Sequence, residues 1–410
     1  MLKHVFTLVW NRRRANALIL AELLLSFLVL AAVLGVGAYY AAHWLQPLGF
    51  DYEDVWRARV MWGRWSTATD DERRAILTRL TAIRHAVAGL DAVETTSYVG
   101  NTPYSSSTHS STQYFDGRRE QTLTAQADVE ARRVLRLELV AGRWLEPGDD
   151  ALGYRPAVIN RHYARTVFGD ADPVGRFVPN FDSSSGEPSE PDPDEIREKV
   201  IGVVEAYRRD GELRRDTYTL FTLRGQDDVE RYPPSELLVR TAPGTSAAFE
   251  EELSRTLAAA APDWDFRVDK LAVARRDRLN ESLLPLLLAS IICGFLILMV
   301  GMGLIGVLWQ SVSRRAQELG LRRALGATVR SVRLQVLGEL LALTTVAVAL
   351  GSALFLQAPL LDLIGRVGSG IYLTALGTAM VIVYAFVVLC GLYPSWLATR
   401  VEPAEALAYE

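Results

Sequence analysis

The segment between the second and third apolar runs of the chain combines charge with small residues. Residues 311–334 contain six arginines and a single acidic residue, Glu318, which stands among them. Guanidinium and carboxylate groups at this density favour ionic contact with another surface rather than catalysis. Contact with anionic lipid or a role in membrane topology would account for the arginines alone. Neither role requires Glu318 or the glycines at 320 and 326, so the sequence favours a docking element for another protein.

Side chains that would support catalysis or metal binding are scattered. The chain has three lysines and no Gly-x-x-x-x-Gly-Lys-Ser/Thr loop, so we expect no ATP hydrolysis of the P-loop type. It has no Gly-x-Ser-x-Gly motif and no His-Glu-x-x-His motif. His109 lies in a Ser/Thr-rich run that suits a hydrophilic loop better than a nucleophile site. Cys293 and Cys390 lie within apolar runs and belong to no cysteine–histidine cluster. We therefore expect no catalytic residue, no metal and no cofactor bound by this chain.

Two acidic residues interrupt otherwise apolar runs. Glu22 lies near the inner end of the first run, where it would reach lipid headgroups or pair with an arginine at 12–14. Glu339 lies about one turn inside the third run, within reach of Arg333 or another helix. Ionisable groups in membrane spans are functional candidates. A proton relay would need a chain of such groups across the bilayer, which the runs do not supply, so a structural role is favoured for both.

Four apolar runs position these residues. The chain is 50% hydrophobic yet 22% charged, so its apolar residues are concentrated in segments. A helix of about 20 apolar residues crosses a bilayer. The first run is longer than the apolar part of a signal peptide, roughly 7–15 residues, and is retained as an anchor in our interpretation. The predicted transmembrane helices are 17–42, 283–309, 336–357 and 371–397.

Basic residues orient these helices. Lys3 and the arginines at 12–14 place residues 1–16 in the cytoplasm by the positive-inside rule. Alternation then gives an outside domain at 43–282, a cytoplasmic loop at 310–335, an outside loop at 358–370 and a cytoplasmic tail at 398–410. The outside domain carries 32 basic and 41 acidic residues and no cysteine, which suits an exported segment.

The outside domain has the pattern of an α+β fold. Strand and helix patterns alternate near 51–100 and again near 235–272, which predicts two βαβ units. The insertion between them, 101–234, is β-rich. Its strand candidates include 135–140, 157–160 and 200–204. Within it, residues 179–195 are rich in proline, serine and acid and are expected to form a solvated loop.

The segments that join this domain to the spans are expected to form a stalk. Residues 275–281 precede the second span, which would continue outward as a helix through Asn280, and Pro285 would bend it or mark where its buried part starts. Residues 49–56 would supply the other side of the stalk. The predicted fold class is thus membrane α-helical with an α+β extracytoplasmic domain: four transmembrane helices, a helical stalk, two βαβ units and a β-rich insertion.

The cytoplasmic segment resembles a motif of the permease subunits of MacB/FtsX/LolC-type ABC systems, the type VII or mechanotransmission superfamily. That motif is Arg-x-x-Glu-Ile-Gly-x-x-Arg-Ala-x-Gly-Ala, and Leu319 replaces its isoleucine here. The identical positions are Arg315, Glu318, Gly320, Arg323, Ala324, Gly326 and Ala327. Glu339 follows at the family's position. Residues 142–149, 157–176 and 200–204 resemble the family's outside core, and residues 393–407 resemble its tail. The third span departs from the family because it lacks the usual Gly-Gly run before Gly351.

The resemblance implies that residues 314–327 form an amphipathic coupling helix in a groove of an ATPase dimer. The ATPase would be a separate polypeptide that uses ATP and Mg. Leu319 would supply apolar contacts, and Arg322 and Arg323 would supply ionic contacts. The coupling residues implied are Arg315, Glu318, Leu319, Gly320, Arg322, Arg323, Ala324, Gly326 and Ala327.

The implied protein is a permease subunit in the bacterial cytoplasmic (inner) membrane. ATP binding and hydrolysis by the ATPase would move the MacB-like core domain for export or extraction of a substrate. One ATPase dimer needs two docking helices, which implies a second permease copy, identical or paralogous. Membrane lipid, a periplasmic adaptor and an outer-membrane channel are further candidate partners, and nucleic acid is not. The alternative is an FtsX-like transmitter that regulates a cell-envelope hydrolase. An outside domain of about 240 residues favours the MacB/LolC branch.

Overall fold

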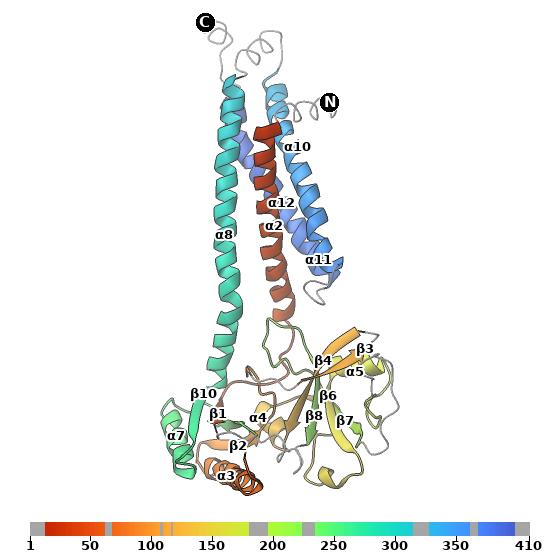
Figure 1. Cartoon of the computed structure of the whole chain (residues 1–410), viewed down its shortest axis with the longest axis vertical. Coiled ribbons are helices and arrows are strands. Elements are labelled where there is room, and N and C mark those ends of the chain that lie inside the picture. The colour runs from red at the N-terminus through yellow and green to blue at the C-terminus, as the bar shows by residue number, and fades with distance from the viewer. Residues whose placement is uncertain are drawn as a thin grey trace. The chain divides into compact units, whose positions relative to one another are not determined.

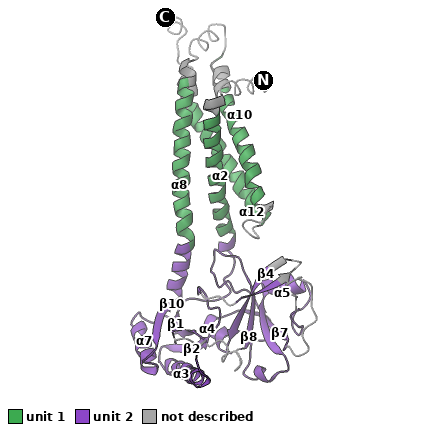
Figure 2. Ribbon diagram, viewed as in Figure 1, with its two compact units in different colours: residues 1–42, 282–410 green, residues 43–281 purple. Residues whose placement is uncertain are grey.

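The computed structural model divides the chain into two compact units (Figures 1 and 2). The helical unit comprises residues 1–42 and 282–410, and the α+β unit comprises residues 43–281. The structure describes residues 13–61, 68–106, 110–115, 118–179, 196–223, 234–314, 328–360 and 368–397.

Four long apolar helices make up most of the helical unit. Each contains a segment long and apolar enough to cross a membrane, the shortest being the 19 residues at Leu337–Phe355. The predicted four transmembrane helices are therefore confirmed. The helices are α2 (Arg13–Trp44), α8 (Leu271–Arg314), α10 (Val329–Phe355) and α12 (Ser369–Leu397), with a short α11 (Gln357–Leu360) between the last two.

Side chains from all four helices meet in one apolar cluster. Its buried members include Phe27 of α2, Leu304 of α8, Ala347 of α10 and Val387 of α12. Helix α8 contributes least, since 11% of its most apolar window is buried against 33% in each of the other three. Most of the apolar surface of α8 is therefore left open by the rest of the helical unit.

The two predicted βαβ units form one four-stranded antiparallel sheet in the α+β unit, with strand order β10-β1-β9-β2. Strand β9 lies between β1 and β2, and β1 lies between β9 and β10, so the two units interleave as split βαβ units. Trp56, Ile83, Leu237 and Leu253 are buried between the sheet and its two helices. The elements are β1 (Val55–Met61), α3 (Asp70–Ala88), β2 (Val93–Tyr98), β9 (Glu236–Thr241), α7 (Phe249–Ala260) and β10 (Asp265–Lys270).

The insertion forms a second, mixed sheet of order β3-β4-β8-β6-β7-β5. The pairs β4–β8 and β6–β7 are parallel, and the other pairs are antiparallel. Successive side chains of β6 lie on opposite faces of this sheet. Val158 packs in the core that contains α4, and Ile159 packs in the core that contains α5. The elements are β3 (Ser110–Phe115), β4 (Arg118–Ala127), α4 (Ala131–Leu135), β5 (Leu139–Gly142), η2 (Asp149–Ala151), β6 (Arg155–Asn160), α5 (Arg161–Phe168), β7 (Glu198–Val204) and β8 (Tyr218–Leu223).

Two sequence expectations differ from this fold. The strand expected at 135–140 is wrong in its first half, because Leu135 ends α4 and Arg136 takes a left-handed conformation before β5 starts at Leu139. The second difference concerns the predicted stalk. Its α8 side is helical as expected, since α8 begins at Leu271 and passes through Pro285 without interruption. Its other side, expected at 49–56, is not a helix, because residues 45–54 form turns and irregular structure.

Candidate functional site

The structure places both flanks of the predicted coupling segment at one end of the helical unit. Helix α8 ends at Arg314 and α10 begins at Val329, and these ends lie together with the start of α2 and the end of α12 (Figure 1). The coupling residues themselves lie outside the described residues: Arg315, Glu318, Leu319, Gly320, Arg322, Arg323, Ala324, Gly326 and Ala327. A partner that binds this segment would therefore act on α8 and α10 together.

Two glycines of the helical unit face aromatic side chains of neighbouring helices. A Cβ atom on Gly301 of α8 would lie 2.8 Å from the ring of Phe386 on α12. A Cβ atom on Gly351 of α10 would lie 2.5 Å from the ring of Phe27 on α2. Small residues at such contacts allow the close backbone approach on which packing between membrane helices depends. Helix α8 therefore contacts α12 at Gly301, and α10 contacts α2 at Gly351.

The two carboxylates predicted within the spans, Glu22 and Glu339, lie on different helices and have different neighbours. The Glu22 side chain is half-buried between α2 and α8, where a Cβ atom on Gly303 would lie 3.1 Å from a carboxylate oxygen. The side chains at 12–14, with which Glu22 was predicted to pair, lie outside the described ones. Glu339 is half-buried on α10 beside buried Leu340. Gly303 thus provides the space for Glu22, a contact that sequence reasoning missed.

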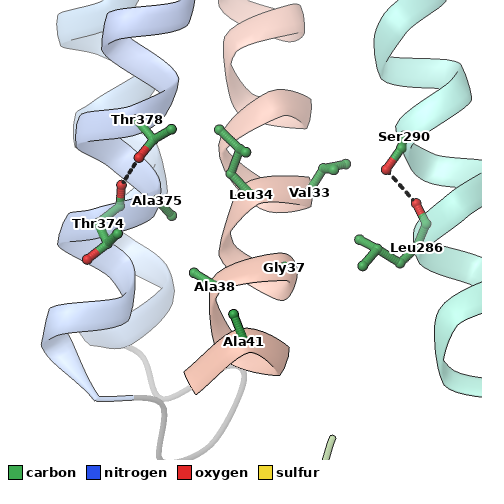
Figure 3. Close-up of a pocket in the computed structure, with 10 residues that line it drawn as sticks. All are labelled: Val33, Leu34, Gly37, Ala38, Ala41, Leu286, Ser290, Thr374, Ala375 and Thr378. Atoms are coloured by element: carbon green, nitrogen blue, oxygen red, sulfur yellow. Dashed lines mark hydrogen bonds between the residues drawn. The ribbon is translucent and has the colours of Figure 1, made fainter. Parts of the chain in front are cut away.

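A groove of about 410 Å³ opens between α2, α8 and α12 (Figure 3). Its hydroxyl groups donate to carbonyls of their own helices: Ser290 to Leu286 at 2.8 Å and Thr378 to Thr374 at 2.8 Å. The groove is consequently apolar in character and offers space for a hydrocarbon chain rather than polar chemistry. The remaining lining residues are Val33, Leu34, Gly37, Ala38, Ala41, Thr374 and Ala375. The small residues at 37, 38 and 41 were the available sequence signal for it.

The α+β unit contains a carboxyl group with an altered proton affinity. Burial raises the pKa of Asp216 to about 6, and the nearby positive charge of Arg208 opposes that rise only in part. The Asp216 carboxylate accepts a hydrogen bond from Nδ2 of Asn160 at 3.1 Å. Among the residues that the structure describes, no group of three or more His, Cys, Asp and Glu side chains is arranged to hold a metal ion.

Two family models match the chain along most of its length. The MacB-like periplasmic core domain matches residues 25–256, and the FtsX-like permease C-terminal domain matches residues 290–403. The first match alone spans more than half of the chain, and the second spans the helices on both sides of the coupling segment. The chain therefore belongs to the MacB/FtsX-like family of ABC transporter permeases.

Several known proteins are similar to the chain. The macrolide export ATP-binding/permease protein MacB of Bdellovibrio bacteriovorus is 25% identical over 66% of this chain and 41% of its own length. The pyoverdine export ATP-binding/permease protein PvdT of Pseudomonas savastanoi is 23% identical over 69% of this chain and 42% of its own. The ABC transporter permease YknZ of Bacillus subtilis is 23% identical over 67% of this chain and 66% of its own. The chain thus spans less than half the length of the MacB and PvdT relatives.

Solved structures of two extracellular regions also align with the chain. The periplasmic region of MacB from Actinobacillus actinomycetemcomitans covers 58% of this chain at 12% identity, with a TM-score of 0.37. The extracellular domain of YknZ from Gram-positive bacteria covers 52% at 16% identity, with a TM-score of 0.33.

Proposed function

We propose that this permease couples ATP binding and hydrolysis by a separate ABC ATPase to movement of its α+β unit, for export or extraction of a substrate. The observation that carries the proposal is the continuity of α8. This single helix begins within the α+β unit at Leu271 and ends at Arg314, directly before the coupling segment. A displacement at one end of such a helix is passed along its length without any substrate crossing the bilayer.

Other features support the same function. The relatives MacB and PvdT are described as export ATP-binding/permease proteins. In our proposal the ATPase binds residues 315–327, using Glu318 and Arg323 for ionic contacts and Gly320 and Gly326 for close approach. The nine coupling residues predicted from the sequence remain the proposed docking surface. ATP and Mg are used by the partner.

The proposed orientation follows the positive-inside rule. Residues 1–16, the coupling segment and the tail face the cytoplasm, and the α+β unit lies outside the cytoplasmic (inner) membrane. A second permease copy, identical or paralogous, completes the assembly because an ATPase dimer offers two grooves. A periplasmic adaptor and an outer-membrane channel are proposed as partners of the α+β unit.

Charge reversal in the coupling segment tests the docking role. The tagged chain is purified in mild detergent from its own host, and the co-purified proteins and their ATP turnover are measured. We expect Glu318→Arg and Arg323→Glu each to lower the recovered ATPase by about tenfold, which corresponds to a loss of roughly 1.4 kcal/mol of binding free energy. Glu250→Arg, at an exposed site on α7, makes the same charge change elsewhere and should leave recovery unchanged. Full recovery and turnover with both coupling variants would show that the docking assignment is wrong.

The alternative function is FtsX-like transmission of a signal to a cell-envelope hydrolase, which the match at residues 290–403 does not distinguish from transport. The same purification separates the two functions. An adaptor or channel bound to the α+β unit indicates transport, whereas a bound hydrolase whose activity depends on ATP indicates signalling.

A further inference from the structure

One loop of the α+β unit contacts both connections that lead to the helical unit. The loop is Arg208–Glu212, which we name the clasp loop, and it lies between β7 and β8 of the six-stranded sheet. The first connection is the chain that follows α2, and the second is the beginning of α8. All contacts described below lie within residues 43–281, the α+β unit.

The clasp loop holds the first connection through backbone contacts. The Arg208 backbone N–H donates to the Leu48 carbonyl at 2.9 Å, and its guanidinium Nη1 donates to the Gln46 carbonyl at 2.9 Å. Gly49 has a φ of +81°, and a Cβ atom there would lie 1.9 Å from the carbonyl oxygen of Ala206. The chain that follows α2 therefore packs with its backbone at Gly49 against the backbone at Ala206, two residues before the clasp loop.

The second connection is held by charge. Leu271 and Ala274, in the first turn of α8, are buried in the core of the α+β unit. From residue 275 to residue 281, all of which the structure describes, no residue is buried. Apolar packing of α8 on the unit therefore stops after one turn, and polar side chains must hold the rest of this segment.

Two arginines one turn apart make those polar contacts. Arg275 forms an ion pair with Glu212, whose side chain is only 7% exposed. An Arg278 guanidinium nitrogen lies 3.7 Å from a carboxylate oxygen of Asp210. Gly211, with a φ of +94°, turns the chain between these two acidic residues. The clasp loop thus presents one carboxylate to each arginine.

Arg275 also contacts the chain on the α2 side. Its guanidinium carbon lies 4.7 Å from the ring centre of Tyr52 and 6.0 Å from the ring centre of Trp44, the last residue of α2. Stacking on aromatic rings and pairing with a carboxylate both exploit the planar, permanently charged guanidinium. A single side chain thereby joins the end of α2, the beginning of α8 and the clasp loop.

We propose that Arg275 is a positioning residue which, with the clasp loop, makes both connections move together with the six-stranded sheet. This inference rests on the proposed function, because it names the joint at which helix movement enters the α+β unit. Without the Arg275–Glu212 pair, α8 beyond its first turn would keep the Arg278 contacts, to Asp210 at 3.7 Å and to the Ser105 carbonyl at 3.3 Å, and would pivot more freely about that turn.

Distance distributions between spin labels test the joint in the full chain. Labels are placed at Asn280→Cys on α8 and Arg165→Cys on α5, in a chain with Cys293→Ala and Cys390→Ala, reconstituted in lipid nanodiscs and diluted with unlabelled chain. Both label sites are exposed and lie within the α+β unit. We expect Arg275→Ala and Glu212→Gln each to widen the distribution roughly twofold. Arg255→Ala removes an exposed pair with Glu251 on α7 and is the matched control, with no change expected.

The charge-swapped double variant Arg275→Glu/Glu212→Arg distinguishes a positioning role from general loss of structure, since it should restore the narrow distribution. Glu212→Gln keeps the shape of the side chain and remains informative if Arg275→Ala does not fold. An unchanged distribution in Glu212→Gln, or equal widening in the Arg255→Ala control, overturns the proposal. This measurement needs no ATPase, so its outcome is independent of the docking experiment. If no ATPase binds, the proposed function is wrong, whereas the role of Arg275 is still decided by the widths of the spin-label distance distributions.

Discussion

At the scale of single residues, Gly49 shows how little tolerance the α+β unit has where the chain leaves α2. Its positive φ and the 1.9 Å approach of a Cβ atom to the Ala206 carbonyl both exclude a side chain. We expect Gly49→Ala to lower the free energy of unfolding by about 3 kcal/mol or more. Gly148→Ala is the matched control, because its φ of −90° is ordinary and a Cβ atom would meet open space. Thermal unfolding of both variants in detergent measures the difference, and equal midpoints would contradict the assigned contact.

Asp216 predicts a defined pH dependence. Its folded-state pKa of about 6 lies above the ordinary value of 3.8, so the folded state binds the proton more tightly. The contribution of this group to stability is therefore fully present below about pH 4 and is lost as pH rises through about 6. A shift of this size corresponds to about 3 kcal/mol.

The variant Asp216→Asn removes that titration. We expect it to gain stability relative to the unsubstituted chain as pH rises from 4 to 7, with most of the gain complete near pH 6. Unfolding midpoints of both proteins across this range provide the measurement. Parallel curves would show that Asp216 keeps an ordinary pKa in the folded protein.

At the scale of elements, packing between α8 and α12 depends on Gly301. A leucine there would drive a side chain into Phe386 and Cys390, and overpacking of this kind costs about 1–3 kcal/mol. Gly301→Leu should consequently lower the temperature at which the two native cysteines become reactive to a fluorescent maleimide. Gly306→Leu, on the same helix with no atom within 4 Å, should leave that temperature unchanged. The same temperature for both variants would mean that α8 and α12 do not pack through Gly301.

The sequence predicts elements whose periodicity is strong. The apolar spans, the βαβ strands and α3 follow from local patterns, and α3 starts at a Thr69–Glu72 capping box. The first half of the strand predicted at 135–140 is wrong because its apolar residues reach the core from a helix and a left-handed turn rather than from a pleated strand. No local pattern encodes that the two βαβ units interleave in one sheet, since this pairing joins residues far apart in the chain.

The candidate site was predictable only in part for the same reason. Glu22 was singled out by its type, yet its contact with Gly303 depends on how α2 and α8 pack. Arg275 and Glu212 carry no motif, and their pairing arises because the fold brings the start of α8 to a loop 63 residues earlier in the chain. The coupling segment was found through its resemblance to a family, and its role stays a prediction.

At the scale of the whole molecule, two compact units are joined by two connections, of which only α8 is a continuous helix. One loop contacts both connections, and two arginines of α8 pair with its carboxylates. The central claim is thus that nucleotide bound by a cytoplasmic partner changes the position of the α+β unit.

That claim is tested most directly by the separation between the α+β units of two permease copies in the assembled ATPase complex. Spin labels at Asp170→Cys, an exposed position after α5, report this separation in a chain whose two native cysteines are replaced by alanine. We predict that ATP shifts the mean distance in the complex and leaves it unchanged in the permease alone. An identical distribution with and without ATP, while the bound ATPase turns over, would contradict the account.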